Sequence, residues 1–177
     1  MSPRAAHDAP FWCEENAWHL CADARLGGHA CAVVVISNPD RCVALWHQRA
    51  ASAPSRPVLW DYHVLVSSRD AEGAHWIWDL DTTLAFPCAA SAWARATLRA
   101  LPGVPAPRLR CIPAEFYRRE FASDRRHMRA PDGTWLQPPP PWPAIGGGHR
   151  LDRLLSFDDD DFGPWLELDV LTERWGG

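Results

Sequence analysis

Two stretches of the 177-residue sequence decide its fold: LWDYHVLVS at residues 59–67 and HWIWDLDTT at residues 75–83. Both are rich in the β-branched, aromatic and aliphatic side chains that favour strands. The segment between them, SRDAEGA at 68–74, is mostly polar and includes a glycine. A short polar segment between two strands is typical of a β-hairpin, so we predict an antiparallel hairpin centred on Ala71.

The two faces of this hairpin differ in chemistry, because successive side chains of a strand point to opposite sides. The first face is apolar and predicts a core, with pairs Val66 and Trp76, Val64 and Trp78, and Tyr62 and Leu80. On the second face Leu65 is predicted opposite Ile77, and His63 opposite Asp79. This second face therefore carries an imidazole beside a carboxylate.

The rest of the chain supplies further strands and helices around the hairpin. Helices are predicted from apolar spacing and proline positions over residues 11–25, 87–101 and 113–121. Strands are predicted over residues 29–37 and 43–47. We therefore expect an α+β fold in which helices flank an antiparallel sheet. The length favours a single domain over residues 1–177, with residues 1–10 as a flexible tail.

Composition excludes several classes of function. The net charge of −4 provides no general attraction to nucleic acid or anionic membrane. No apolar run approaches the ~20 residues that span a bilayer, and no apolar signal segment is present, so we expect a cytoplasmic protein. The six cysteines form no C-x-x-C pair and no H-E-x-x-H occurs, which argues against a metal site. The chain has no lysine, so a lysine-based mechanism is excluded.

Three residues of the sequence could together form a catalytic site. Cys13 lies at the predicted start of the first helix, where unpaired N–H groups and the helix dipole stabilise a thiolate and can hold an oxyanion. His63 and Asp79 would supply a base and a group that orients it. The neighbouring Glu14 and Glu15 oppose thiolate formation. The order Cys, His, Asp on a helix start followed by two antiparallel strands resembles papain-like and transglutaminase-like enzymes.

Each of these three residues also has an ordinary structural explanation. Cys13 could be a small buried apolar residue, His63 a hydrogen-bonded polar residue, and Asp79 the partner of an arginine. Spacing alone leaves these alternatives open.

A longer set of motifs resembles the protein N-terminal glutamine amidohydrolase family. The signature is WDYHV at residues 60–64, and further blocks occur in the same order: CEEN at 13–16, VISN at 35–38, LW at 45–46, DLDT at 79–82, FPC at 86–88, FASDR at 121–125, HM at 127–128 and PPPP at 138–141. The resemblance runs from about residue 11 to 175. It departs at the glycines of 146–148 and the acidic run of 158–161.

The resemblance implies both a catalytic triad and a reaction. The family's cysteine, histidine and aspartate fall on Cys13, His63 and Asp79. The implied reaction is hydrolysis of the side-chain amide of an N-terminal glutamine through a thioester, without cofactor or metal. Its partners would be protein and peptide N-termini that begin with glutamine, and it would act in N-terminal-residue-dependent degradation. Nothing in the sequence demands a dimer, so we expect a monomer.

A free α-ammonium must be recognised if only chain termini react, and acidic residues would do this. The candidates are Glu14, Glu15, Asp61 and Asp124. Two alternatives stay open: a cysteine peptidase or transglutaminase-like enzyme with the same triad, and a non-catalytic module that binds N-terminal residues.

Overall fold

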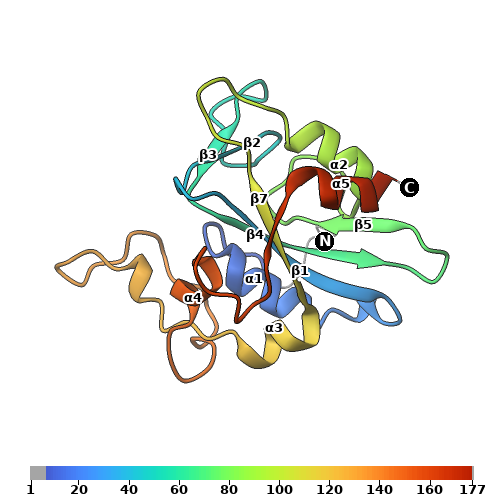
Figure 1. Cartoon of the computed structure of the whole chain (residues 1–177). Helices are drawn as coiled ribbons and strands as arrows, with labels where there is room; N and C mark the ends of the chain where they lie inside the picture. Colours follow the sequence, from blue (N-terminus) through green and yellow to red (C-terminus); the bar gives the residue numbers. More distant parts are fainter. Residues whose placement is uncertain (1–6, 177) are drawn as a thin grey trace.

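A six-stranded antiparallel sheet forms the centre of the computed structural model, which describes residues 7–176 (Figure 1). The strand order is β6-β5-β4-β1-β7-β8. The bounds are β1 Ala30–Ser37, β4 His63–Arg69, β5 His75–Trp78, β6 Cys88–Ala89, β7 Arg108–Pro113 and β8 Trp165–Glu167. A separate two-stranded sheet pairs β2 (Val43–Leu45) with β3 (Val58–Trp60). The predicted strands at 29–37 and 59–67 belong to these sheets, although the second is divided between β3 and β4.

Helices cover both faces of the large sheet (Figure 1). One face packs against α1 (Cys13–Leu20), α3 (Ala114–Glu120) and α4 (Leu151–Leu155). The other face packs against α2 (Ala90–Thr97) and α5 (Leu168–Gly176). This arrangement confirms the predicted α+β class with an antiparallel sheet flanked by helices.

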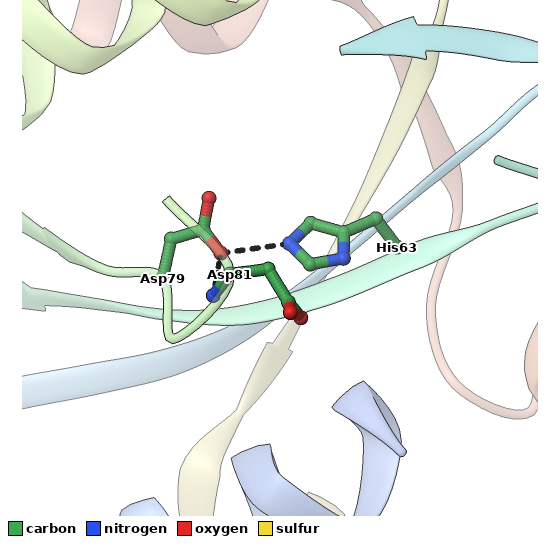
Figure 2. A group of neighbouring side chains, drawn as sticks. All are labelled: His63, Asp79 and Asp81. Carbon is green, nitrogen blue, oxygen red and sulfur yellow. Dashed lines mark hydrogen bonds and ion pairs between the residues drawn. The ribbon is translucent and has the colours of Figure 1, made fainter. Parts of the chain in front are cut away.

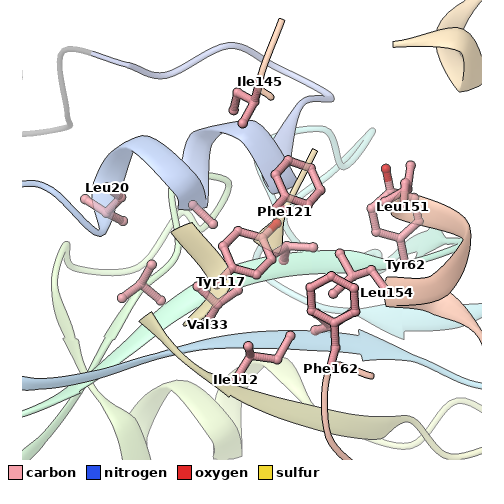
Figure 3. Packing of buried hydrophobic residues seen from close by; sticks show 14 of the residues in the cluster. Leu20, Val33, Tyr62, Ile112, Tyr117, Phe121, Ile145, Leu151, Leu154 and Phe162 are labelled. Carbon is pink, nitrogen blue, oxygen red and sulfur yellow. The ribbon is translucent and has the colours of Figure 1, made fainter. Parts of the chain in front are cut away.

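Alternation along the strands divides the core into two clusters. Val64 and Val66 of β4 point to the face of the sheet that α1 and α3 cover. They belong to one core cluster with the aromatic side chains of Tyr117 and Phe121 (Figure 3). Leu65 of β4 faces α2 on the opposite side of the sheet. The predicted core face of the hairpin is therefore correct, and the second face is buried as well.

The predicted register of the hairpin is wrong by two residues. Val66 pairs with Trp78 instead of Trp76, so the centre of the turn moves from Ala71 to the next residue. The cause is the turn itself: the backbone N–H of Asp70 donates to the carbonyl of Ala74 at 3.0 Å, and Gly73 adopts φ of 91°. A shift of two preserves which face each side chain occupies, because the period of a strand is two.

The predicted helices are present but shorter. The helix expected over 11–25 ends at Leu20 and is followed by a 3₁₀ helix over Ala24–Leu26, because the side chain of Asp23 accepts from the backbone N–H of Arg25 and starts a new turn. Of the helix expected over 87–101, the first residues form β6. The helix expected over 113–121 starts at Ala114, after Pro113 at its N-cap.

The predicted tail over residues 1–10 differs from the structure where the structure describes it. Residues 1–6 lie outside the described part. Ala9 is buried, its backbone N–H donates to Asn16 Oδ1 at 3.0 Å, and its carbonyl accepts from Asn16 Nδ2 at 2.8 Å. Asp8 pairs with Arg49 at 2.8 Å. The tail is thus anchored just before Cys13. Among the described residues, no helix combines the length and apolar character that crossing a membrane requires.

Candidate active site

Cys13 and His63 line one cavity of about 420 Å³. Cys13 is the first residue of α1, and His63 is the first residue of β4. The two elements pack against each other, which brings together residues that lie far apart in the sequence. The predicted position of Cys13 at a helix start is confirmed.

His63 is hydrogen-bonded to Asp79, although the two are not directly opposite in the sheet (Figure 2). β5 ends at Trp78, and the chain then turns so that Oδ1 of Asp79 lies 2.9 Å from Nε2 of His63. A carboxylate can only accept, so Nε2 carries the proton and Nδ1 is left with a free lone pair. Figure 2 shows Nδ1 on the side of the ring away from Asp79.

Both partners are buried, and their pKa values shift as an ion pair would require. Burial lowers the pKa of His63, but the charge and hydrogen bond of Asp79, together with the charges of Asp81 and Glu14, have the larger opposite effect, so the net pKa is raised. Burial raises the pKa of Asp79, but the charge and hydrogen bond of His63, together with the hydrogen bonds from Gln48 and Trp93, outweigh it, so the net pKa is lowered. The carboxylate is therefore suited to stabilise an imidazolium.

The residues that hold Asp79 belong to no sequence motif that points to it. Its Oδ2 accepts from Nε2 of Gln48 at 3.2 Å and from Nε1 of Trp93 at 3.1 Å. Its Oδ1 also accepts from the backbone N–H of Asp81 at 3.0 Å. With His63, four donors occupy the two oxygens. The ring of Trp60 in β3 stacks on His63, with centroids 5.9 Å apart and planes 20° apart.

The electrostatic surroundings of Cys13 keep it a thiol in the free protein. Burial raises its pKa well above the ordinary value, and the carboxylates of Glu14 and Asp81 raise it further. The backbone N–H of Val64 opposes this effect. The thiol also lies 3.7 Å from Oε2 of Glu14, which it can donate to. The predicted stabilisation of a thiolate by the helix start is therefore outweighed, and a base is needed to remove the proton.

Asp81 is a site residue that the sequence reasoning missed. It lines the cavity beside His63 and is only 6% exposed. Among the described residues, no hydrogen bond or ion pair reaches its carboxylate oxygens. Burial raises its pKa. Its position two residues after Asp79 in the DLDT block was a usable signal, because an extended chain would place residues i and i+2 on one side; in the structure the chain turns after Trp78 and still brings Asp81 to the cavity.

His63, Asp79 and Asp81 are also the group within the described residues that could offer three ligand atoms to a metal ion. The ligand atoms lie within 4.8 Å of one another. However, both oxygens of Asp79 already accept two hydrogen bonds each, so an ion would have to displace protein donors. The hydrogen bonds to Asp79 therefore suit a carboxylate that orients His63 better than a carboxylate that binds a metal ion.

Of the four predicted acids, only Asp61 lines the cavity. Glu15 is buried and accepts from Arg125 Nε at 2.8 Å and Nη2 at 2.7 Å, and from Trp142 Nε1 at 2.8 Å, so it is fully occupied. Asp124 is exposed and pairs with Arg126. Their roles in substrate binding are not supported, because their carboxylates already have cationic partners.

Glu14, the fourth acid, is buried behind the cysteine. Its Oε2 accepts from the hydroxyl of Tyr62 at 3.2 Å. Its Oε1 lies 3.2 Å from Nε2 of His127, a residue of the cavity wall, without the geometry of a hydrogen bond. Glu14 does not line the cavity itself, but it contacts three residues that do: Cys13, Tyr62 and His127.

Comparisons with known proteins agree with these motifs. The family model described as N-terminal glutamine amidase matches residues 8–175. Curated proteins named "Protein N-terminal glutamine amidohydrolase" are similar: that of Drosophila pseudoobscura pseudoobscura is 42% identical in an alignment of 155 residues, and that of Drosophila ananassae is 41% identical in one of 153 residues. Each alignment covers 82% of this chain and 75% of the relative. The NMR structure of protein-glutaminase from Chryseobacterium proteolyticum matches with a TM-score of 0.37 and 18% identity, over 72% of this chain and 61% of that one.

Proposed function

Because the chain belongs to the N-terminal glutamine amidase family, we propose that it hydrolyses the side-chain amide of an N-terminal glutamine to glutamate and ammonia. The observation that carries the proposal is the cavity that Cys13 and His63 share, with Asp79 hydrogen-bonded behind the imidazole. A nucleophile, a base and a group that orients the base are the parts that amide hydrolysis through a covalent intermediate needs.

In the first half of the reaction, Nδ1 of His63 takes the proton of the Cys13 thiol as the sulfur attacks the δ-carbon of the substrate amide. The C–S bond forms and the carbonyl oxygen gains the negative charge. The backbone N–H of Cys13 is the proposed donor to this oxyanion, because the first residue of a helix has no acceptor within the helix. The imidazolium then protonates the leaving nitrogen, the C–N bond breaks, and a thioester remains with ammonia released.

In the second half, Nδ1 of His63 takes a proton from water, whose oxygen attacks the thioester carbon. The C–S bond breaks, the proton returns to the sulfur, and the γ-carboxyl group of glutamate is released. Asp79 stabilises the imidazolium in both halves and is itself held by Gln48 and Trp93.

Selectivity for a chain terminus is assigned in this proposal to Asp81. Its carboxylate lines the cavity, is nearly buried and takes part in no hydrogen bond or ion pair among the described residues, so an α-ammonium could bind it directly. Asp61, at the exposed side of the same cavity, is a second acceptor. An N-terminal asparagine is one methylene shorter, and its amide would be held away from the sulfur; this misplacement adds to the binding loss of about 1–3 kcal/mol.

The proposed partners are N-termini of proteins and peptides that begin with glutamine, and neither nucleic acid nor membrane takes part. We further propose that the protein is a monomer and acts in the cytoplasm.

Ammonia release from matched peptides tests the function. The peptides begin with glutamine, begin with acetylated glutamine, begin with asparagine, or carry glutamine internally. We expect efficient release from the first peptide, release from its acetylated copy that is slower by about tenfold or more, none from the other two, and none from the first with Cys13→Ala. Release from the acetylated peptide at the rate of the free one, or from the internal peptide, would contradict terminal selectivity. New peptide fragments would indicate a peptidase, and binding of the peptide without turnover by the unmodified protein would indicate a binding module.

A further inference from the structure

The segment at residues 79–83 carries both aspartates drawn in Figure 2, and a neighbouring stretch, residues 47–49, holds it in place. The two are joined by an isolated antiparallel bridge at Gln48. The carbonyl of His47 accepts from the backbone N–H of residue 83 at 2.7 Å. The φ of His47 is 56°, in the left-handed region, and such a backbone persists only where its surroundings hold it. Strain of this kind concentrates at functional sites.

Arg49 contacts this segment through both its backbone and its side chain. Its backbone N–H donates to the carbonyl of Asp81 at 2.6 Å, and its Nη1 donates to the carbonyl of Leu80 at 2.9 Å. These two carbonyls follow directly after Asp79, whose Oδ1 accepts from the backbone N–H of Asp81. The place of the Asp79 carboxylate behind the imidazole therefore depends on a turn that Arg49 holds from outside.

The same nitrogen of Arg49 also reaches the N-terminal part of the chain. Nη1 donates to Oδ2 of Asp8 at 2.8 Å, and a terminal guanidinium nitrogen carries two hydrogens, so both contacts form at once. Asp8 precedes Ala9, which two hydrogen bonds tie to Asn16 of α1. Arg49 thus joins the turn behind the imidazole to the helix that begins with Cys13.

The pair of Arg49 and Asp8 is too exposed to contribute much to overall stability. The side chain of Arg49 is 38% exposed and that of Asp8 is 19% exposed, and water screens ion pairs of this kind. The pair matters through geometry instead. A misplacement of about 1 Å between reacting groups can slow a reaction about 100-fold, even when its cause lies far from the chemistry.

We propose that Arg49, together with Asp8, is a positioning residue that fixes the helix of the nucleophile relative to the imidazole. The inference rests on the proposed function. Arg49 does not line the cavity. It acts through the turn after Asp79 on one side and through the residues before Cys13 on the other.

Kinetics with a peptide that begins with glutamine test the proposal in Arg49→Ala and Asp8→Ala. Each variant should lower kcat about tenfold and keep KM within about twofold, because the peptide still binds but the reacting groups are misplaced. The double variant should lose no more than Arg49→Ala, because breaking either end breaks the same connection. Arg49→Lys should recover most of the loss: one nitrogen makes both contacts, and a lysine ammonium offers three hydrogens to them.

The pH profile separates an effect of position from an effect of charge. If the turn loosens, Asp79 supports the imidazole less, the pKa of His63 falls, and the acidic limb of kcat/KM moves to lower pH in both variants. An effect of charge alone would have opposite signs: loss of the Arg49 cation raises the pKa of His63, and loss of the Asp8 carboxylate lowers it. Opposite shifts in the two variants would therefore overturn the proposal.

Arg108→Ala is the matched control. Arg108 pairs with Glu167 at 2.7 Å and its side chain is 43% exposed, close to the value for Arg49. Its pair joins β7 to β8, and neither residue lines the cavity. This variant should keep kcat and the pH profile unchanged. An equal loss of kcat in Arg108→Ala would overturn the proposal, and so would an unchanged kcat in both Arg49→Ala and Asp8→Ala.

Labelling of Cys13 by iodoacetamide gives a result that does not depend on turnover. Loosening of the residues before Cys13 should expose its thiol, so the labelling rate at a fixed pH should rise several-fold in Arg49→Ala and Asp8→Ala but not in Arg108→Ala. If the unmodified protein releases no ammonia, the proposed function fails, while these rates still show whether the pair fixes the helix of the nucleophile. Unchanged rates in both variants would overturn that role.

Discussion

Nε2 of His63 lies 2.9 Å from Oδ1 of Asp79, and both side chains are almost wholly buried. The carboxylate fixes the proton on Nε2 and so determines which ring nitrogen can act as a base. It also raises the pKa of His63 against the effect of burial. The position of Asp79 therefore sets both the direction and the strength of the proposed base.

Asp79→Asn should lower kcat about 10⁴-fold, the size of the equivalent effect in serine proteases, with little change in KM. The variant should also change the pH profile. The base must be neutral to act, so activity is lost as the pH falls through the pKa of His63, which lies above its ordinary 6.5. Without the carboxylate, burial lowers this pKa, and the acidic limb of kcat/KM should move to lower pH. An unmoved limb would show that another group controls it.

The contact between His63 and Asp79 could be predicted from the sequence even though the register was wrong. Alternation decides which side of the sheet each residue occupies, and a shift of two leaves that side unchanged. The register itself depends on the turn at Asp70–Ala74 and on the backbone of Gly73, which alternation does not report.

Other parts of the site depend on tertiary packing and were not predictable in this way. Gln48 comes from a loop and Trp93 from the middle of α2, and neither has a motif that points to Asp79. Glu15 was expected near the substrate as one of the acidic candidates for binding the α-ammonium. On a helix, however, adjacent residues point in different directions, and Glu15 faces Arg125.

Arg125 should be essential for stability, because it pairs with Glu15 in the interior. The pair is buried on both sides, so Arg125→Gln leaves a carboxylate without its cation and should cost about 3–5 kcal/mol of unfolding free energy. Arg126→Gln is the matched control: its pair with Asp124 is 68% exposed at the arginine, so its loss should leave the unfolding free energy almost unchanged. Urea unfolding followed by fluorescence measures both. Equal effects would contradict the structural role given to Glu15.

Cys13 should react slowly with iodoacetamide at neutral pH, because the thiol is the resting form. Burial and the carboxylates of Glu14 and Asp81 raise its pKa, so the labelling rate should still be rising above pH 8. Glu14→Gln removes one of these charges and should increase the rate several-fold at pH 7. Mass spectrometry of the Cys13 peptide follows the reaction, with the half-buried Cys42 as an internal reference. A rate that is already constant below pH 8 would indicate a resting thiolate–imidazolium pair instead.

Asp81 should control the preference for a free N-terminus. Replacing it by asparagine removes the charge at nearly constant size, so the variant should lose affinity for the ammonium. The measured quantity is the ratio of kcat/KM for a glutamine peptide with a free amine to that for its acetylated copy. Any damage to His63 affects both peptides alike and cancels in the ratio. Loss of a charged hydrogen bond, about 1.5–3 kcal/mol, should reduce the ratio at least tenfold.

Asp152→Asn provides the comparison for this test, because Asp152 also lines the cavity but its side chain is 89% exposed. A solvated carboxylate gains little from a nearby ammonium, so this variant should keep the ratio within about twofold. If Asp81→Asn slows both peptides equally, Asp81 acts on the imidazole alone. The ammonium would then be bound by Asp61, a third acid of the same cavity wall, and Asp61→Asn should lower the ratio instead.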